Sequence, residues 1–366
     1  MTDLVNSLLA DNLKALKPYE SARRLFSSAD SGENQIWLNA NESSFTNSYE
    51  IDSSNFNRYP DCQPPEVVEA YAKYAGVNST QLLISRGADE GIELLIRTFC
   101  TPGQDSILIC PPTYGMYAIS AETCNVGIEK APLLNDFSLD IPAINTFKGK
   151  VNLVFICSPN NPTGTTVSKA QLQQVIEHFA DSALVVVDEA YIEFDLANNW
   201  AMQLQQYPNL VILRTLSKAF ALAGLRCGFT LAAADIINAL MKVIAPYPVP
   251  NPVAQIAAQA LSKHGLRQMS QQVISIKAER SKIKQALAQI TDIELVGDEK
   301  ANFILFRHPR KQALMDYLVS NGVLIRDQSK QINLENCLRI TIGSAEQNEK
   351  LLTNITSFFA PQEKTA

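Results

Sequence analysis

The sequence predicts an α/β protein in which a mainly parallel sheet is followed by a smaller α+β domain. Between about residues 80 and 235, short apolar runs alternate with helical patterns, as is typical of strands joined by helices in a parallel sheet. After about residue 240 the pattern changes to long helical stretches with two isolated strand-like runs. The chain has 366 residues, which is enough for two or three domains.

The strands of the larger domain are predicted from short runs of apolar, often β-branched residues. Because successive residues in these runs are apolar, both faces of each strand should be buried. Helical patterns lie between them, at 91–99 and 169–180. The runs are residues 81–85, 106–110, 152–157, 184–188 and 210–215.

The smaller domain is predicted from the change after the Pro-rich stretch 245–252. Long helical sequence follows, then strand-like runs at 302–307 and 337–343, with helical patterns between and after them. The stretch 36–44 is too short to stand alone and should join one of the two domains. We therefore predict an N-terminal arm, a large domain and a small domain, at residues 1–30, 31–264 and 265–366.

Composition excludes several classes of protein. The net charge is −6, whereas binding to a nucleic-acid backbone requires a concentrated basic face. There is no apolar run of about 18 residues, so no transmembrane helix is expected. The three histidines have no zinc-site spacing, so we expect no metal. Seven cysteines, an odd number without any CxxC pair, and the absence of a signal peptide favour reduced thiols in the cytoplasm.

Four motifs stand where predicted strands end, the edge at which ligands bind in open α/β sheets. In 85–99 a glycine opens a helix, whose N-terminus favours a phosphate, although a capped helix explains it too. In 157–164 prolines and asparagines favour a rigid turn that presents Asn161, although a plain loop explains this motif as well. In 184–194 Asp188 follows four apolar residues, where a carboxylate requires a partner.

The fourth motif, 210–229, places Ser217 and Lys218 at a strand end before small apolar residues. Partial desolvation lowers the pKa of a lysine and favours a nucleophilic amine. Taken together, the motifs supply an imine-forming lysine, a carboxylate for a ring nitrogen, hydrogen-bond donors and a phosphate cradle. These are the parts that hold pyridoxal phosphate.

The chain resembles the fold-type I, aspartate-aminotransferase-like pyridoxal phosphate enzymes, among the class-II aminotransferases. Within them it is similar to the histidinol-phosphate aminotransferase family. The resemblance implies a mainly parallel seven-stranded sheet in the large domain. It runs nearly end to end and rests on residues 18–24, 37–43, 58–64, 85–97, 110–117, 157–164, 188–194, 214–229, 244–248, 326–328 and 337–343.

The resemblance also implies roles for individual residues. Lys218 would form the internal aldimine with the cofactor and then shuttle the substrate proton, and Asp188 would pair with the pyridine nitrogen. Tyr191 and Asn161 would bond the ring 3-oxygen, and Tyr114 would stack on the ring. The phosphate would be held by Ser217, Arg226, the backbone N–H groups of Ala88 and Asp89, and Tyr59 of a neighbouring subunit in a homodimer. Ala88 stands where many relatives have Ser or Thr, so only its backbone donor remains.

For the substrates, the resemblance implies that Arg339 binds the α-carboxylate of glutamate as a bidentate fork. Arg326 and Tyr19 would bind the phosphate of histidinol phosphate, and Asn41 would line the substrate side. The implied reaction is a ping-pong transfer of an amino group between L-histidinol phosphate and 2-oxoglutarate in histidine biosynthesis. A decarboxylase of an amino-acid phosphate and a non-enzymatic, cofactor-sensing regulator remain as alternatives.

Overall fold

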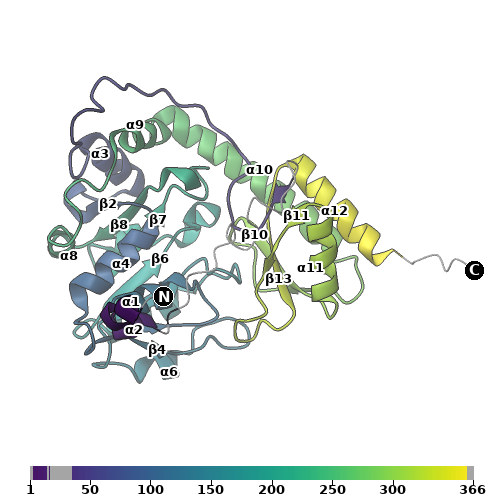
Figure 1. The fold of residues 1–366 in the computed structure, drawn as a ribbon, viewed down its shortest axis with the longest axis horizontal. Coiled ribbons are helices and arrows are strands. Elements are labelled where there is room, and N and C mark those ends of the chain that lie inside the picture. The colour runs from purple at the N-terminus through teal and green to yellow at the C-terminus, as the bar shows by residue number, and fades with distance from the viewer. Residues whose placement is uncertain (1–2, 15, 17–34, 361–366) are drawn as a thin grey trace, which may run out of the picture.

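The computed structural model describes residues 3–14, 16 and 35–360, and Figure 1 shows a larger and a smaller part joined by the long helix α10 (Lys263–Leu287). The larger part contains a seven-stranded sheet in the order β2-β8-β7-β6-β5-β3-β4. Strand β8 runs antiparallel to both of its neighbours, β2 and β7, and the remaining neighbouring pairs are parallel. The strands are β2 (Leu82–Ser85), β3 (Ser106–Ile109), β4 (Gly127–Lys130), β5 (Leu153–Cys157), β6 (Leu184–Asp188), β7 (Leu210–Thr215) and β8 (Gly228–Ala232).

The mainly parallel seven-stranded sheet is confirmed, and five of its strands lie where the apolar runs predict them. Successive residues of β5, such as Val154 and Phe155, belong to two different hydrophobic clusters on opposite faces of the sheet. Burial on both faces is why these strands read as continuous apolar runs. The pattern missed β4, a partly exposed edge strand with two charged residues, and β8, which is hidden in a longer stretch of small apolar residues.

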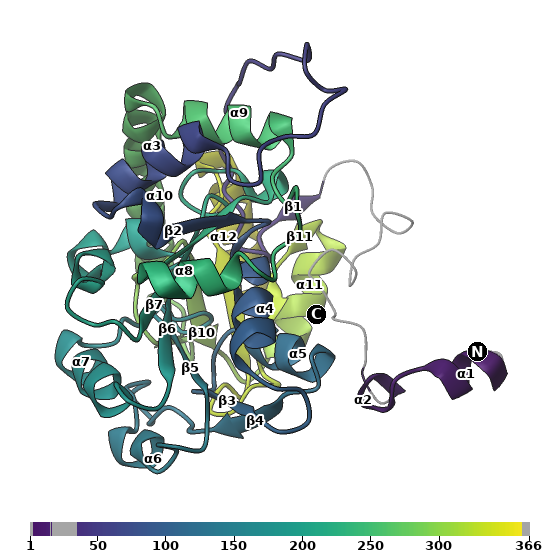
Figure 2. The same cartoon turned by 90° about the vertical axis from the view of Figure 1, so that its left-hand side faces the viewer.

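Helices cover both faces of this sheet (Figures 1 and 2). They follow strands in the βαβ manner, and most bury one apolar side against the sheet. The helices are α3 (Pro65–Ala75), α4 (Ala88–Phe99), α5 (Met116–Thr123), α6 (Ile141–Asn145), α7 (Lys169–His178), α8 (Ala234–Leu240) and α9 (Asn251–Ala260). Short 3-10 turns lie at Ser79–Gln81, Ile192–Phe194, Leu196–Asn198, Ala201–Gln203 and Ala223–Leu225.

The smaller part contains an antiparallel sheet in the order β12-β13-β10-β9, which shares a hydrophobic core with two helices. Its strands are β9 (Glu294–Val296), β10 (Phe303–Arg307), β12 (Arg326–Asp327) and β13 (Cys337–Thr341), and its helices are α11 (Lys311–Ser320) and α12 (Ala345–Phe359). The strand β1 (Ile36–Trp37) pairs in parallel with β11 (Val323–Leu324) of this part. This pair forms a two-stranded sheet that is separate from the four-stranded one, and it ties residues 36–37 to the smaller part.

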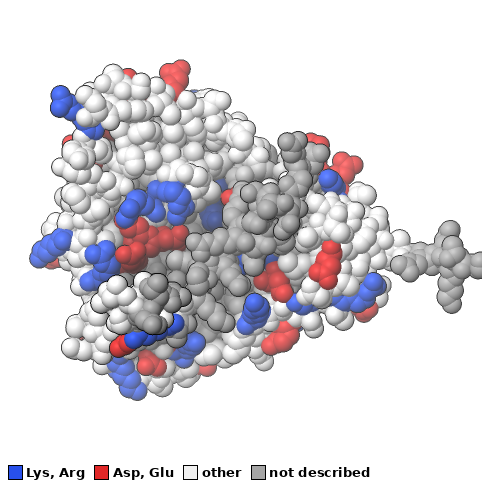
Figure 3. Space-filling view, viewed as in Figure 1, with Lys and Arg blue, Asp and Glu red and all other residues white. Residues whose placement is uncertain are grey.

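Near the N-terminus, α1 (Asp3–Leu8) and α2 (Asp11–Lys14) are separate short helices, and Leu4 and Leu8 are exposed. The side-chain amide of Asn12 donates to the Glu122 carbonyl at 2.9 Å, which ties α2 to the end of α5. Among the described residues, no helix is long and apolar enough to cross a membrane. On the described part of the face seen in Figure 3, basic and acidic side chains are interspersed.

Candidate active site

A cavity of about 530 Å³ lies at the carboxyl ends of β5, β6 and β7, between the larger and the smaller part. Its position follows from the parallel sheet, because polar side chains at neighbouring strand ends meet at one edge. Most of the predicted site residues line it. They are Asn41, Ala88, Asp89, Tyr114, Asn161, Asp188, Tyr191, Ser217, Lys218, Arg226, Arg326 and Arg339.

One end of the cavity is built for an anion. The N-terminus of α4 opens at Gly87, which has φ of 81°, and presents the backbone of Ala88 and Asp89. A Cβ atom on Gly87 would lie 2.6 Å from the Arg226 guanidinium, so only glycine allows this close approach. Arg226 reaches Ser217 Oγ at 3.5 Å.

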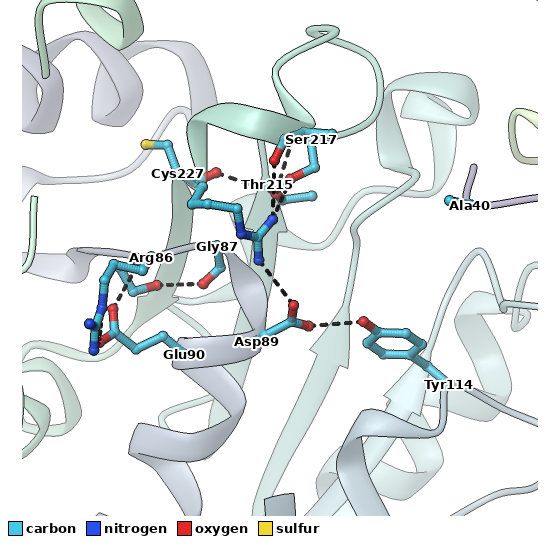
Figure 4. A network of polar contacts seen from close by, with 12 residues as sticks. Ala40, Arg86, Gly87, Asp89, Glu90, Tyr114, Thr215, Ser217 and Cys227 are labelled. Carbon is cyan, nitrogen blue, oxygen red and sulfur yellow. Dashed lines mark hydrogen bonds and ion pairs between the residues drawn. The ribbon is translucent and has the colours of Figure 1, made fainter. Parts of the chain in front are cut away.

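Asp89 shares this end of the cavity with Arg226, and Figure 4 shows the Asp89 carboxylate directed at the Tyr114 hydroxyl. Its carboxylate lies 3.1 Å from the Arg226 guanidinium and accepts a hydrogen bond from the Tyr114 hydroxyl at 3.0 Å. The ion pair is half-exposed, so it holds the arginine in place only weakly. An incoming phosphate can therefore compete for the guanidinium.

Asp188 forms the floor of the cavity. The residue is only 3% exposed, and its carboxylate accepts hydrogen bonds from the Tyr117 hydroxyl at 2.6 Å and from the Ala190 N–H at 3.0 Å. Burial raises the pKa of Asp188 to about 6, against the opposing effect of these donors. A buried carboxylate of this kind favours a cationic N–H partner. Sequence reasoning missed Tyr117, although it ends the predicted motif 110–117.

Lys218 faces Asp188 from the end of β7. Its Nζ atom donates to the Ala40 carbonyl at 3.3 Å and lies 5.7 Å from the centre of the Tyr191 ring. Burial, with Arg339 nearby, lowers the pKa of Lys218 to about 8. The Tyr191 hydroxyl accepts a hydrogen bond from the Asn41 side chain at 2.9 Å. Because its pKa is lowered to about 8, Lys218 is partly uncharged near neutral pH, as a nucleophilic amine requires.

Two arginines form the wall contributed by the smaller part. Arg326 of β12 and Arg339 of β13 are direct partners across the antiparallel pair. Arg339 donates to the side-chain oxygen of Asn161 at 2.5 Å and to the Asn39 carbonyl at 2.9 Å. Like charges placed opposite each other on two strands repel, and an anion between them would remove that repulsion. This wall therefore suits an anionic substrate.

Behind the cavity lies a buried ion pair that sequence reasoning missed. Arg214 and Glu189 are almost fully buried and approach within 2.7 Å. Glu189 also accepts a hydrogen bond from the Trp200 N–H at 2.7 Å. These residues stand next to Thr215 and Asp188 in the sequence. A charged residue inside each apolar motif was the available signal, but side-chain direction is not visible in a sequence.

One predicted residue lies elsewhere, and another is not described by the structure. Tyr59 is 81% exposed and stacks on Tyr247 with ring centres 4.4 Å apart, so it does not line the cavity of its own chain. Tyr19 lies outside the described residues. Among the residues that the structure describes, no group of three or more His, Cys, Asp or Glu side chains could hold a metal ion.

The cavity fits pyridoxal phosphate part by part. The glycine-lined cradle with Arg226 and Ser217 suits the phosphate, and the buried carboxylate of Asp188 suits a protonated ring nitrogen. The partly uncharged amine of Lys218 suits the aldehyde. Fold and site together define a fold-type I, pyridoxal-phosphate-dependent enzyme.

Comparison with known proteins agrees with this class. The family described as aminotransferase class I and II matches residues 33–355. A histidinol-phosphate aminotransferase of Pseudoalteromonas atlantica is 70% identical over 365 residues, covering 100% of this chain and 98% of the relative. One from Yersinia enterocolitica is 52% identical and covers 95% of this chain and 92% of the relative. The chain belongs to the class I and II aminotransferases and, within them, to the histidinol-phosphate aminotransferase family.

Solved structures show the same fold. The histidinol-phosphate aminotransferase from Sinorhizobium meliloti in complex with pyridoxal 5′-phosphate superposes with a TM-score of 0.83 at 20% identity. It covers 96% of this chain and 98% of that chain. The enzyme from Clostridium acetobutylicum gives a TM-score of 0.77 at 26% identity, covering 83% of this chain and 91% of that chain.

Proposed function

We propose that this protein transfers the amino group between L-histidinol phosphate and 2-oxoglutarate, with imidazole acetol phosphate and L-glutamate on the other side of the equilibrium. This reaction belongs to histidine biosynthesis and is catalysed by histidinol-phosphate transaminase (EC 2.6.1.9). The observation that supports it best is the pair Arg326 and Arg339, partners on adjacent strands, in the cavity that also contains Lys218. The two amino donors, histidinol phosphate and glutamate, each carry an amine and an anion, and 2-oxoglutarate carries the same carboxylates as glutamate, so one such wall serves both half-reactions in turn.

Pyridoxal phosphate, when bound, supplies a ring that withdraws electrons from the substrate Cα. The residues of this chain hold it and move protons. Lys218 would bind the cofactor covalently and, when displaced by the substrate amine, would carry a proton from the substrate Cα. Asp188 would keep the ring nitrogen protonated, because a carboxylate buried at this depth is most stable beside a cation.

The remaining cofactor contacts orient the ring. Tyr191 and Asn161 would donate to its 3-oxygen, and Tyr114 would cover one face. In the structure, Asn161 and Tyr191 are held by Arg339 and Asn41 respectively, so their positions are fixed by substrate-side residues. The phosphate would lie among Ser217, Arg226 and the backbone N–H groups of Ala88 and Asp89.

The substrate contacts divide between the two arginines. Arg339 would take the α-carboxylate of glutamate as a planar fork. Arg326, with Tyr19, would take the phosphate of histidinol phosphate, and Asn41 would line this side. The two half-reactions would then alternate in a single site, which gives a ping-pong order.

Tyr59 would reach the cofactor phosphate of a second copy of this chain, so the working enzyme would be a homodimer in the cytoplasm. Its exposed position and its place on a segment that leaves the cavity support this proposal. We also propose an arm of residues 1–30, a large domain of 31–264 and a small domain of 265–366, the last beginning within the first turn of α10.

The test is an assay of the purified protein with histidinol phosphate and 2-oxoglutarate. We expect glutamate to form in equal amount to imidazole acetol phosphate, and Lys218→Ala to abolish this. Release of carbon dioxide from threonine phosphate, without glutamate formation, would instead favour the decarboxylase and reject the proposal.

A further inference from the structure

A segment that we call the strap, residues 43–58, leaves the cavity after Asn41 and crosses to α3. It contains no helix and no sheet strand, and it runs beside α9 and α10 (Figures 1 and 2). Phe45 and Tyr49 of its first half pack against the core, whereas its second half, including Ile51 and Phe56, is exposed, so burial of apolar surface holds that second half only weakly. Tyr59 follows directly after it. The stack of Tyr59 on Tyr247 fixes this end of the strap, and other contacts must hold the exposed residues before it.

Two glutamines of α9 hold the strap by pairing with its backbone. Gln255 accepts a hydrogen bond from the Asp52 N–H at 2.7 Å and donates to the Asp52 carbonyl at 2.8 Å. Gln259 accepts from the Glu50 N–H at 3.1 Å and donates to the Glu50 carbonyl at 2.7 Å. Each side-chain amide thus takes the place of a peptide group in a neighbouring strand.

The spacing of the two pairs explains why this pairing repeats. Gln255 and Gln259 are four residues apart on one helix face, a rise of about 6 Å. Asp52 and Glu50 are two residues apart, and extended chain advances about 6.6 Å over that interval. The two repeats match closely, and the strap runs antiparallel to α9. The other N–H of each glutamine amide is used within the helix, by Asn251 and by the Gln255 carbonyl, which fixes the side chains.

A third contact ties the strap to α10 and to the cavity. The side-chain oxygen of Asn47 accepts hydrogen bonds from Gln268 at 3.0 Å and from Gln272 at 2.7 Å. The Asn47 amide in turn approaches the carbonyl of Phe220 at 3.5 Å, two residues after Lys218. The helices therefore hold the strap at three points between Asn41 and Tyr59.

We propose that Gln255 and Gln259 are positioning residues for Tyr59. By pairing with the strap backbone they hold Tyr59 where it meets the cofactor phosphate of the neighbouring subunit. This inference rests on the proposed function of Tyr59 in a homodimer. Without the two glutamines, the strap would regain conformational freedom, and Tyr59 would meet the phosphate in fewer molecules.

The test combines the double variant Gln255→Leu/Gln259→Leu with Tyr59→Phe. Hydrogen–deuterium exchange measures directly how firmly the strap is held, because the Glu50 and Asp52 N–H groups donate the hydrogen bonds to Gln259 and Gln255. We expect faster exchange there and about tenfold weaker binding of pyridoxal phosphate in the double variant. In the Tyr59→Phe background the same double change should weaken cofactor binding less than about twofold, because the contact is already lost.

The matched control is Gln271→Leu, an exposed glutamine of α10 whose side chain makes no hydrogen bond within the described residues. It should leave exchange and cofactor binding unchanged. Unchanged exchange in the double variant, or full additivity with Tyr59→Phe, would overturn the positioning role. If Tyr59→Phe alone binds cofactor normally, the proposed role of Tyr59 falls and the positioning role falls with it, even where strap exchange has risen.

Discussion

At the scale of single residues, two ionisable groups of the cavity, Asp188 and Lys218, are held by uncharged hydrogen-bond partners. Asp188 is held by two neutral donors, and burial raises its pKa to about 6. Lys218 contacts a carbonyl, and burial lowers its pKa to about 8. Both groups can therefore pair with a ligand that brings a cationic N–H group to Asp188 and an aldehyde to Lys218.

Lys218 leads to a prediction about pH. Because its pKa is about 8 rather than 10.5, the neutral amine becomes the main form above pH 8. The rate at which the cofactor-free protein captures pyridoxal phosphate should rise with pH, with a midpoint near 8. Stopped-flow absorbance measures this rate, and borohydride reduction followed by peptide mapping should place the adduct on Lys218. A midpoint near 10, or an adduct on another lysine, would contradict the assignment.

Asp188 leads to a second prediction. Asp188→Asn removes the charge that would stabilise a protonated ring nitrogen, so turnover should fall by about a hundredfold or more. Tyr117→Phe is the matched control, because it removes the donor to Asp188 and leaves the carboxylate in place. Steady-state kinetics of both variants decide the matter. Equal losses in the two would mean that the hydrogen bond, and not the charge, is what matters.

At the scale of elements, the ends of β6 and β7 carry the chemistry on one side and an ion pair on the other. Glu189 follows Asp188, and Arg214 precedes Thr215, whose hydroxyl donates to Ser217 at 2.9 Å. The pair Glu189–Arg214 thus joins the two strand ends beneath the cavity. Its partners are buried, so removing one leaves an uncompensated charge.

Glu189→Gln should therefore destabilise the protein by about 3–5 kcal/mol. Glu193→Gln is the control nearby, since burial raises the pKa of Glu193 to about 7. The folded state binds the Glu193 proton more tightly than the unfolded state, so this residue lowers stability as the pH rises from about 4.5 to 7. Glu193→Gln should gain stability relative to the unchanged protein over that range. Denaturant unfolding at several pH values measures the free energy of unfolding of both variants. A Glu189→Gln variant as stable as the unchanged protein would refute the prediction for Glu189.

The sequence predicts elements well where burial is complete. The strands β3, β5, β6 and β7 are buried on both faces and were predicted within about one residue. The edge strand β4 and the strand β8 were not, because exposure and small residues weaken the apolar pattern. The site could be predicted only in part, because a sequence does not show in which direction a side chain points. Lys218 and Asp188 followed from the motifs, whereas the role of Tyr117 depends on a contact across 71 residues.

At the scale of the whole molecule, the proposed homodimer has a consequence that can be measured. A site lacking Tyr59 and a site lacking Lys218 are each defective, but a mixed dimer contains one whole site. Random mixing makes half of the dimers mixed, so Tyr59→Ala and Lys218→Ala chains together should recover about a quarter of the full activity. The assay requires refolding or subunit exchange of the mixture. Activity that stays at the sum of the separate variants would show that Tyr59 does not serve a neighbour.

The pairing of β1 with β11 has a consequence for how the protein is made. The Thr341 N–H donates to the Leu38 carbonyl at 2.9 Å, and the Ile36 N–H donates to the Gly322 carbonyl at 2.8 Å. Residues 36–41 are thus synthesised long before the residues with which they pair. Contacts so distant along the chain close slowly. Asn39 and Asn41 must wait for Arg339 and Thr341, so the growing chain cannot complete this wall of the cavity before residues 339–341 have been synthesised.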